Sequence, residues 1–196
     1  MHGSEIRHSM GNLNPTLWRT CKMLSGQTRI RLLRQLHQHP GRNVSELGAS
    51  VGIQRANASQ ELRRIQSRGL LKSARRGCPL VYAMSPDPQV ASAAPLLKAI
   101  EAALTSRPPE RDLEMCVLAN GLAHERRIRI AQALLGSPRS ISDLGPIVNI
   151  PTPSLAKHVH ALINSGFAVK RNRLVHFTEP RHPLARALVV LLKQTK

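Results

Sequence analysis

Apolar residues recur at every third or fourth position through much of the chain, which is the spacing of one buried face of an α-helix. Two Arg-rich segments carry the same apolar series, Ile30, Leu33 and Leu36 in the first and Ile128, Ala131 and Leu134 in the second. Short strand-like runs separated by turn residues follow each segment, at 70–74 with 80–85 and at 167–171 with 174–178. The pattern predicts a mainly α fold with small β-hairpins.

The order of these segments repeats within the chain. The aligned segments are 24–36 with 122–134 at an offset of 98, and 44–48 with 141–145 at an offset of 97. Because order and spacing are preserved over both segments, we interpret the chain as a tandem duplication of one module. The expected boundaries are 12–106 for the first domain, 107–111 for a linker that contains Pro108 and Pro109, and 112–196 for the second domain.

Each module is predicted to contain the same elements in the same order. An opening helix (15–23 and 112–119) precedes the Arg-rich helix, and a short helix with an Asn or Ser cap follows. Gly52 and Asn149 end the short helices, since both residue types tolerate a positive φ. The remaining elements are a longer helix at 54–68 and 152–165, the hairpin, and a last helix at 90–105 and 183–194. This is the order of a winged helix-turn-helix, so we expect two such domains in a pseudo-two-fold arrangement.

Three strings in the first module carry a family signature, and they read LSGQTRIRLLRQL, VSELGASVGI and ASQELRRIQSRGLLKSARRGCPLVYAMSP. They resemble the ArsR-type winged-helix transcriptional regulators over residues 24–88, and residues 122–180 keep the same skeleton with looser detail. The resemblance implies a DNA-binding regulator whose opening and last helices are buried in a two-fold dimer. With two modules in one chain, the copies can cover each other, so we favour a monomeric pseudo-dimer over a homodimer.

The chain is strongly basic along its whole length. It has 29 Lys and Arg against 11 Asp and Glu, a net charge of +18. Residues 1–106 contribute +10 and residues 107–196 contribute +8, so both modules are basic. This charge favours a polyanionic partner, because each neutralised phosphate releases counterions. Four aromatic residues are too few to stack the bases of single strands, so we expect double-stranded DNA as the partner.

The hydrophobic segments and the cysteines indicate the cellular compartment. No apolar run approaches the ~20 residues of a membrane span, and the polar first residues lack the apolar core of a signal peptide. Cys21, Cys78 and Cys116 lie far apart in the sequence without a CxxC pair, which fits a reducing compartment. We therefore expect a cytoplasmic, nucleoid-associated protein without a membrane partner.

The longer helix of the first module carries the candidate base-reading residues. Ala58, Leu62 and Ile65 lie on one side of this helix and are expected to face the core. The amino-terminal part of such a helix enters the major groove, where Asn and Gln bind adenine and Arg binds guanine. The base-reading candidates are Gln54, Arg55, Asn57 and Gln60, and the phosphate-binding candidates are Arg63 and Arg64. Glu61 lies beside this face, and we expect it to pair with a neighbouring Arg.

The second module presents a less Arg-rich surface, which suits an asymmetric DNA site rather than a palindrome. Its candidates are Thr152, Ser154, Lys157, His158 and His160. The wings supply flexible cations for phosphates or the minor groove, Arg75 and Arg76 in the first module and Lys170, Arg171 and Arg173 in the second. On the Arg-rich helices, Arg29 and Arg127 are expected to serve the fold, while Arg31, Arg34, Arg126 and Arg129 are further candidates for backbone contact.

Neither a cofactor nor a catalytic site is predicted. ArsR-type proteins often bind metals through Cys in the short helix or through His and carboxylates on the last helix, and this chain lacks both sets at those places. The sequence has no GxSxG motif, phosphate-binding glycine loop or nucleotide-binding fingerprint. Cys21 and Cys116 both lie in opening helices, where we expect two buried thiols; a redox pair is the alternative.

The function expected from the sequence is a sequence-specific, double-stranded DNA-binding transcriptional regulator. Its recognition helices would enter the major groove and its basic wings would contact the backbone. A sequence-tolerant architectural or chromatin protein is one alternative, because it would share the charge and lack the sequence preference. A protein-interaction scaffold of tandem winged helices is the other, although such surfaces seldom need so basic a recognition helix.

Overall fold

The computed structural model describes residues 16–75 and 80–195, and its helices and strands follow the predicted order. The first half contains α1 Leu17–Leu24, α2 Gln27–Gln38, α3 Val44–Val51, α4 Arg55–Gln66, β1 Leu71–Arg75, β2 Leu80–Met84 and α5 Ala93–Ser106. The second half contains the 3-10 turn η1 Pro109–Arg111, α6 Leu113–Gly121, α7 Glu125–Gly136, β3 Arg139–Ser140, α8 Ile141–Val148, α9 Thr152–Asn164, β4 Ala168–Arg171, β5 Leu174–Phe177 and α10 Pro183–Gln194. The predicted fold class, mainly helical with small antiparallel hairpins, is confirmed.

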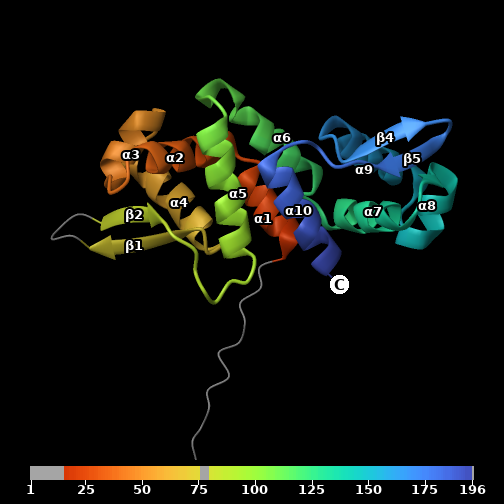
Figure 1. Cartoon of the computed structure of the whole chain (residues 1–196), viewed down its shortest axis with the longest axis horizontal. Coiled ribbons are helices and arrows are strands. Elements are labelled where there is room, and N and C mark those ends of the chain that lie inside the picture. The colour runs from red at the N-terminus through yellow and green to blue at the C-terminus, as the bar shows by residue number, and fades with distance from the viewer. Residues whose placement is uncertain (1–15, 76–79, 196) are drawn as a thin grey trace, which may run out of the picture.

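The molecule is elongated, with a lobe at each end and a group of helices between them (Figure 1). The first lobe comprises α2, α3, α4 and the β1–β2 hairpin, and the second comprises α7, α8, α9 and the sheet of order β3-β5-β4. The central helices are α1, α5, α6 and α10. Within this one chain α5 packs on α10 and α1 packs on α6, so the opening and last helices of the two halves cover each other.

Both short helices are delimited by their own sequence. Asn43 caps α3 through a reciprocal capping box with Glu46, and Ser140 caps α8 in the same way with Asp143. Gly52 ends α3 at a φ of +74° and Asn149 ends α8 at +51°, both in the left-handed region. The predicted caps and stops are therefore confirmed, and they set the turn that leads into α4 and α9.

A few boundaries and one strand differ from the sequence prediction. The last helix of the first half begins at Ala93 rather than at residue 90, because the chain first makes a turn in which the Val90 N–H donates to the Asp87 carbonyl at 3.0 Å. The two-residue strand β3, which pairs with β5, was not predicted; the first half has only an isolated bridge between Asn43 and Val81. The predicted linker contains the η1 turn.

A buried ion pair joins the two halves. Arg34 on α2 is 6% exposed, and its guanidinium donates to the two carboxylate oxygens of Asp112 at 2.6 and 3.0 Å. The same group donates to the carbonyl of Leu104 at 2.5 Å and to that of Arg107 at 2.9 Å. The interpretation of Arg34 as a possible DNA-backbone contact was therefore wrong, because its charge is used inside the fold.

The aligned position in the second half is occupied by an uncharged residue. Gln132 on α7 lies 98 positions after Arg34, and its Nε2 donates to the carbonyl of Thr195 at 2.6 Å and to that of Leu192 at 3.3 Å. Both side chains thus bind the carboxyl end of the last helix of their own half. Among the described residues, Arg34 also binds a carboxylate of the other half, whereas Gln132 does not.

The segment next to this ion pair is held by further polar contacts. Arg107 contacts Glu114 at 3.4 Å and donates to the Arg181 carbonyl at 3.2 Å. His182 caps α10 by accepting the Leu184 N–H on Nδ1 at 3.1 Å. Burial, with the cationic Arg107 nearby, lowers the pKa of His182 to about 4. The folded protein therefore holds this imidazole neutral.

Replacing Arg34 by Ala should destabilise the fold strongly, by about 3–5 kcal/mol, because Asp112 would remain buried without its cation. Urea unfolding monitored by circular dichroism measures the change. Arg31→Ala is the matched control, since Arg31 lies exposed on the same helix, and a change within about 0.5 kcal/mol is expected there. Equal effects of the two substitutions would contradict the role given to the ion pair.

The pH dependence of the free energy of unfolding should reflect the lowered pKa of His182. Its pKa is about 4 in the folded state against an ordinary value of 6.5, so the unfolded chain binds more protons between these values. The free energy of unfolding should therefore fall as the pH drops from 6.5 towards 4. His182→Asn keeps a good helix cap but cannot titrate, so it should weaken this decline.

Denaturant unfolding at a series of pH values makes the comparison. The decline should be weakened rather than abolished, because burial also lowers the pKa values of His124 and His158. If the free energy of unfolding falls equally with pH in the original and the substituted protein, His182 contributes nothing to the pH dependence.

Candidate nucleic-acid interface

The outward face of α4 gathers the predicted base-reading residues. Its opposite face is formed by Ala58, Leu62 and Ile65, which are fully buried and attach the helix to the core. The exposed residues include all six first-half candidates, Gln54, Arg55, Asn57, Gln60, Arg63 and Arg64. Gln54 is the residue that precedes the first turn, so the candidates extend from the amino end of α4 along most of its length.

Glu61, at the edge of this face, is neutralised within the fold. Its carboxylate contacts Arg29 at 2.6 Å and also pairs with Arg64. The predicted pairing of Glu61 with a neighbouring Arg is therefore confirmed. The pairing leaves the face of α4 with a net positive charge.

Arg29 and Arg127 occupy equivalent structural positions. The Arg29 side chain also donates to the Met23 carbonyl near the end of α1. Arg127 on α7 donates to the Asn120 carbonyl at 2.5 Å, near the end of α6. Each side chain ties the Arg-rich helix to the helix before it, as expected for residues that serve the fold.

The first wing presents a polar outer surface. Strands β1 and β2 pair from Leu71 with Met84 to Arg75 with Leu80, and the side chain of Tyr82 in β2 is buried. Residues 72–75 are all exposed, and they include Lys72 in addition to the predicted Arg75. Arg76, the other predicted wing residue, lies outside the residues that the structure describes.

The candidate surface on α9 is less uniform than the one on α4. Thr152, Lys157 and His160 are exposed on α9, whereas Ser154 and His158 are partly buried. The His158 ring lies 4.7 Å from that of His124, measured between centroids. Burial, together with nearby His124 and Arg127, lowers the pKa of His158, so this side chain is held neutral.

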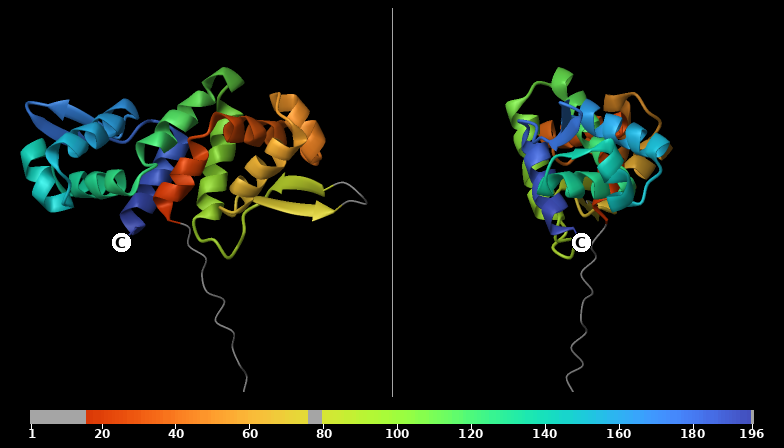
Figure 2. Two further views of the ribbon diagram at one scale, coloured as in Figure 1. Left: turned by 180° about the vertical axis from the view of Figure 1, so that it is seen from behind. Right: turned by 90° about the vertical axis from the view of Figure 1, so that its right-hand side faces the viewer.

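The second wing turns tightly at its tip. Asn172 and Arg173 have φ angles of +47° and +68°, which are typical of a two-residue hairpin turn. The predicted wing cations Lys170, Arg171 and Arg173 are all exposed there. Seen end-on, α5 and α10 lie along one side of the molecule and α9 along the opposite side (Figure 2).

A basic cleft that no sequence pattern indicated adjoins the face of α4. It has a volume of about 430 Å³ and lies among α1, the start of α2 and the end of α4. Its cationic lining residues are Arg19, Lys22, Arg29, Arg64 and Arg68. These residues come from three separate segments, so their spacing along the chain gave no signal for the cleft.

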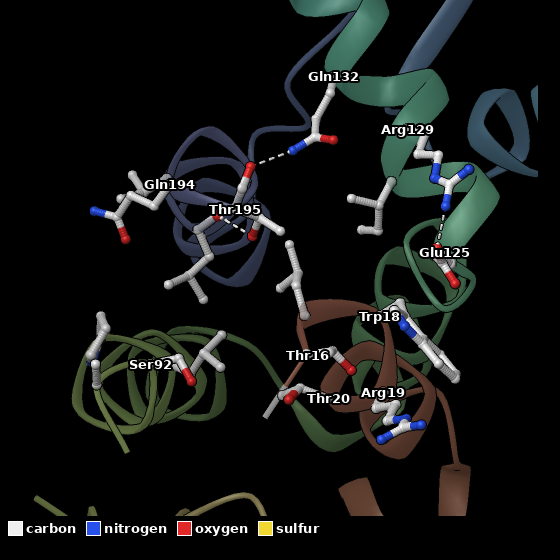
Figure 3. A pocket seen from close by; sticks show the side chains of 17 residues that line it. Thr16, Trp18, Arg19, Thr20, Ser92, Glu125, Arg129, Gln132, Gln194 and Thr195 are labelled. Carbon is white, nitrogen blue, oxygen red and sulfur yellow. Dashed lines mark hydrogen bonds and ion pairs between the residues drawn. The ribbon is translucent and has the colours of Figure 1, made fainter. Parts of the chain in front are cut away.

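A larger cavity of about 1020 Å³ lies between the halves, among α1, the start of α5, α7 and the end of α10 (Figure 3). Trp18 and Arg19 lie on one wall, and the Glu125–Arg129 ion pair lies on another. The hydroxyl oxygens of Thr20 and Ser92 are buried there without a hydrogen-bond partner among the described residues. Gln132 borders this cavity, whereas the aligned Arg34 is packed against Asp112.

The two described cysteines are buried as free thiols. Burial raises the pKa of Cys21, and burial also raises that of Cys116 to about 11. Thiols held in the protonated form are poor nucleophiles, which favours the expected core role. Cys78 lies outside the described residues.

The described residues contain neither a cluster of metal-ligating side chains nor a helix that could span a membrane. In 16–75 and 80–195, no three His, Cys, Asp or Glu side chains are placed to hold a metal ion together. No helix in these ranges combines the length and the apolar character needed to cross a membrane.

Residues 27–76 match the family model of the MarR family, whose members are winged helix-turn-helix transcriptional regulators. The matched segment runs from α2 to the end of β1, so it includes the candidate recognition helix α4. This part of the chain is a winged helix-turn-helix domain, and its match is to the MarR family rather than to the ArsR family that the motifs resemble. Neither the curated proteins nor the solved structures include a significant match to the chain.

Proposed function

We propose that this chain is a sequence-specific regulator of transcription that binds double-stranded DNA with two winged helix-turn-helix domains. The observation that carries the proposal is the exposed polar face of α4 within a segment similar to MarR-family regulators. Helices in this position insert their amino-terminal part into the major groove. The net charge of +18 supports a polyanionic partner.

A second domain in residues 112–196 is supported by the element order and by equivalent contacts. Helices α6 to α9 and strands β4 and β5 follow one another as α1 to α4 and β1 and β2 do. Arg29 and Arg127 make equivalent contacts, and so do Arg34 and Gln132. We therefore propose domains at 12–106 and 112–196 that arose by tandem duplication, joined by 107–111.

The single chain is proposed to act as a pseudo-dimer. The packing of α1 on α6 and of α5 on α10 buries the apolar helices that would otherwise require a second chain. Such a pseudo-dimer would place its recognition helices in successive major grooves, about 34–36 Å apart. A two-chain particle in light scattering would contradict this assembly.

We propose that the two halves contact DNA with different residues. Gln54, Arg55, Asn57 and Gln60 are proposed to contact bases, with Arg63 and Arg64 on phosphates. In the second half the proposed contacts are Thr152, Ser154, Lys157, His158 and His160. Of these, Thr152, Lys157 and His160 are exposed. This difference supports an asymmetric DNA site, with the wings Arg75, Arg76, Lys170, Arg171 and Arg173 on the backbone.

Replacing Gln60 by Ala should relax sequence preference at one base pair, by about 1–3 kcal/mol of discrimination. The site is first selected from random duplexes with the unchanged protein, and fluorescence anisotropy then compares single base-pair variants. Gln38→Ala is the control, because Gln38 is exposed at the end of α2, outside the proposed interface.

Two outcomes would favour the alternative functions. Selection without any motif would indicate an architectural protein that binds DNA irrespective of sequence. Failure to bind any duplex at physiological salt would indicate an interaction scaffold instead.

Replacing Arg75, Lys170 and Arg171 by Gln should weaken binding to all duplexes alike. Each lost phosphate contact should reduce the slope of log Kd against log salt concentration by about 0.9. Titrations at several salt concentrations measure the slope, with Lys193→Gln on the exposed side of α10 as control. A loss confined to certain sequences would assign these side chains to base reading instead.

A further inference from the structure

The basic cleft beside α4 contains cations without anionic partners. Arg29 and Arg64 share the carboxylate of Glu61. Arg19, Lys22 and Arg68 take part in none of the ion pairs found in residues 16–75 and 80–195. The cleft therefore holds three positive charges that the described protein does not neutralise.

Arg68 is half-buried, whereas Arg19 and Lys22 are exposed. Its Nε is buried without a hydrogen-bond partner among the described residues. Burial and the nearby charge of Arg19 lower its pKa. The Arg19 guanidinium itself lies 5.0 Å from the centre of the Trp18 ring. Crowded like charges and an unsatisfied buried donor both cost free energy, and an anion in the cleft would remove both costs.

The cleft continues the proposed base-reading face of α4. Gln60, Arg64 and Arg68 follow one another at intervals of four residues, which places them along one side of the helix and its end. Arg68 directly follows Ser67, the residue that ends α4 in helical conformation. A duplex seated on Gln60 therefore has its backbone close to the cleft.

Further cationic side chains lie between the cleft and the second half. Lys22 is close enough to His124 for its charge to contribute to lowering the pKa of that imidazole. His124 begins α7, and its ring packs on His158 of α9. Arg126, the second residue of α7, is exposed and has no ion-pair partner among the described residues. We call Arg19, Lys22, Arg68 and Arg126 the central track.

We infer that the central track binds the phosphate backbone of the DNA that lies between the two recognition helices. The inference rests on the proposed function and adds to it a contact region that belongs to neither recognition helix nor wing. Flexible cations are sufficient for phosphate contact, which requires no stacking or base recognition. A row of cations from the end of α4 across α1 to the start of α7 fits the regularly spaced phosphates of a duplex, whereas a single small anion would occupy only the cleft.

The experiment compares two triple variants of the full chain that lose the same charge. The track variant carries Arg19→Gln, Lys22→Gln and Arg68→Gln. The control carries Lys98→Gln, Arg186→Gln and Lys193→Gln, all exposed on α5 and α10, which lie on the side opposite α9 (Figure 2). Both are titrated with the selected duplex at several salt concentrations, and phosphate ethylation interference then maps the contacts.

The track variant should reduce the salt slope by about 2.7, or 0.9 for each of three phosphates, and the control should leave it unchanged. Interference should disappear at phosphates between the two lobes and persist beneath the recognition helices. If the track variant fails to fold, judged by thermal unfolding, Arg19→Gln with Lys22→Gln replaces it, since both side chains are exposed, and a reduction of about 1.8 is expected.

Equal salt slopes for the track and control variants, with unchanged interference, would overturn the inference while leaving the proposed function intact. Tight binding of inorganic pyrophosphate that does not compete with the duplex would also overturn it, by assigning the cleft to a small anion. Failure of the unchanged protein to bind any duplex would instead refute the proposed function itself.

Discussion

The buried guanidinium of Arg34 is the contact on which the arrangement of the two halves depends. A buried cation is tolerated only when a carboxylate and further acceptors satisfy it. Arg34 obtains these from Asp112, Leu104 and Arg107, which belong to the start of the second half, the end of α5 and the connecting segment. The contact thereby holds the end of α5, the connecting segment and the start of the second half against α2, at the point where the chain passes from one half to the other.

The two halves are similar in their scaffold and different in their chemistry. Equivalent arginines tie each Arg-rich helix to the helix before it, and capping boxes start both short helices. In contrast, α4 presents exposed arginines, whereas α9 packs His158 against His124 and holds it neutral. Arg34 binds Asp112 in the first half, whereas the aligned residue of the second half, Gln132, borders a cavity. The two halves therefore share a scaffold but present different side chains on α4 and α9.

Much of the fold could be predicted because its signals are local. Apolar spacing identified the buried faces of α4 and α9, and Gly52 and Asn149 marked turns that need positive φ. The pairing of Glu61 could also be anticipated, since Arg64 lies three residues away on the same helix. Two features could not be predicted from the sequence. The late start of α5 depends on a turn at Asp87, and the strand β3 depends on pairing with a distant strand.

The order of the elements, the exposed polar face of α4 and the basic character of both halves could be predicted before any folding was considered, because each is set by neighbouring residues or by composition. Three other features depend on how the chain folds in space: the burial of Arg34, the cleft lined by Arg19, Lys22 and Arg68, and the cavity between α1 and α7. These features join side chains from distant segments, and periodicity along a chain carries no information about which helices pack together. Whether a cation faces water or a carboxylate is therefore decided by packing.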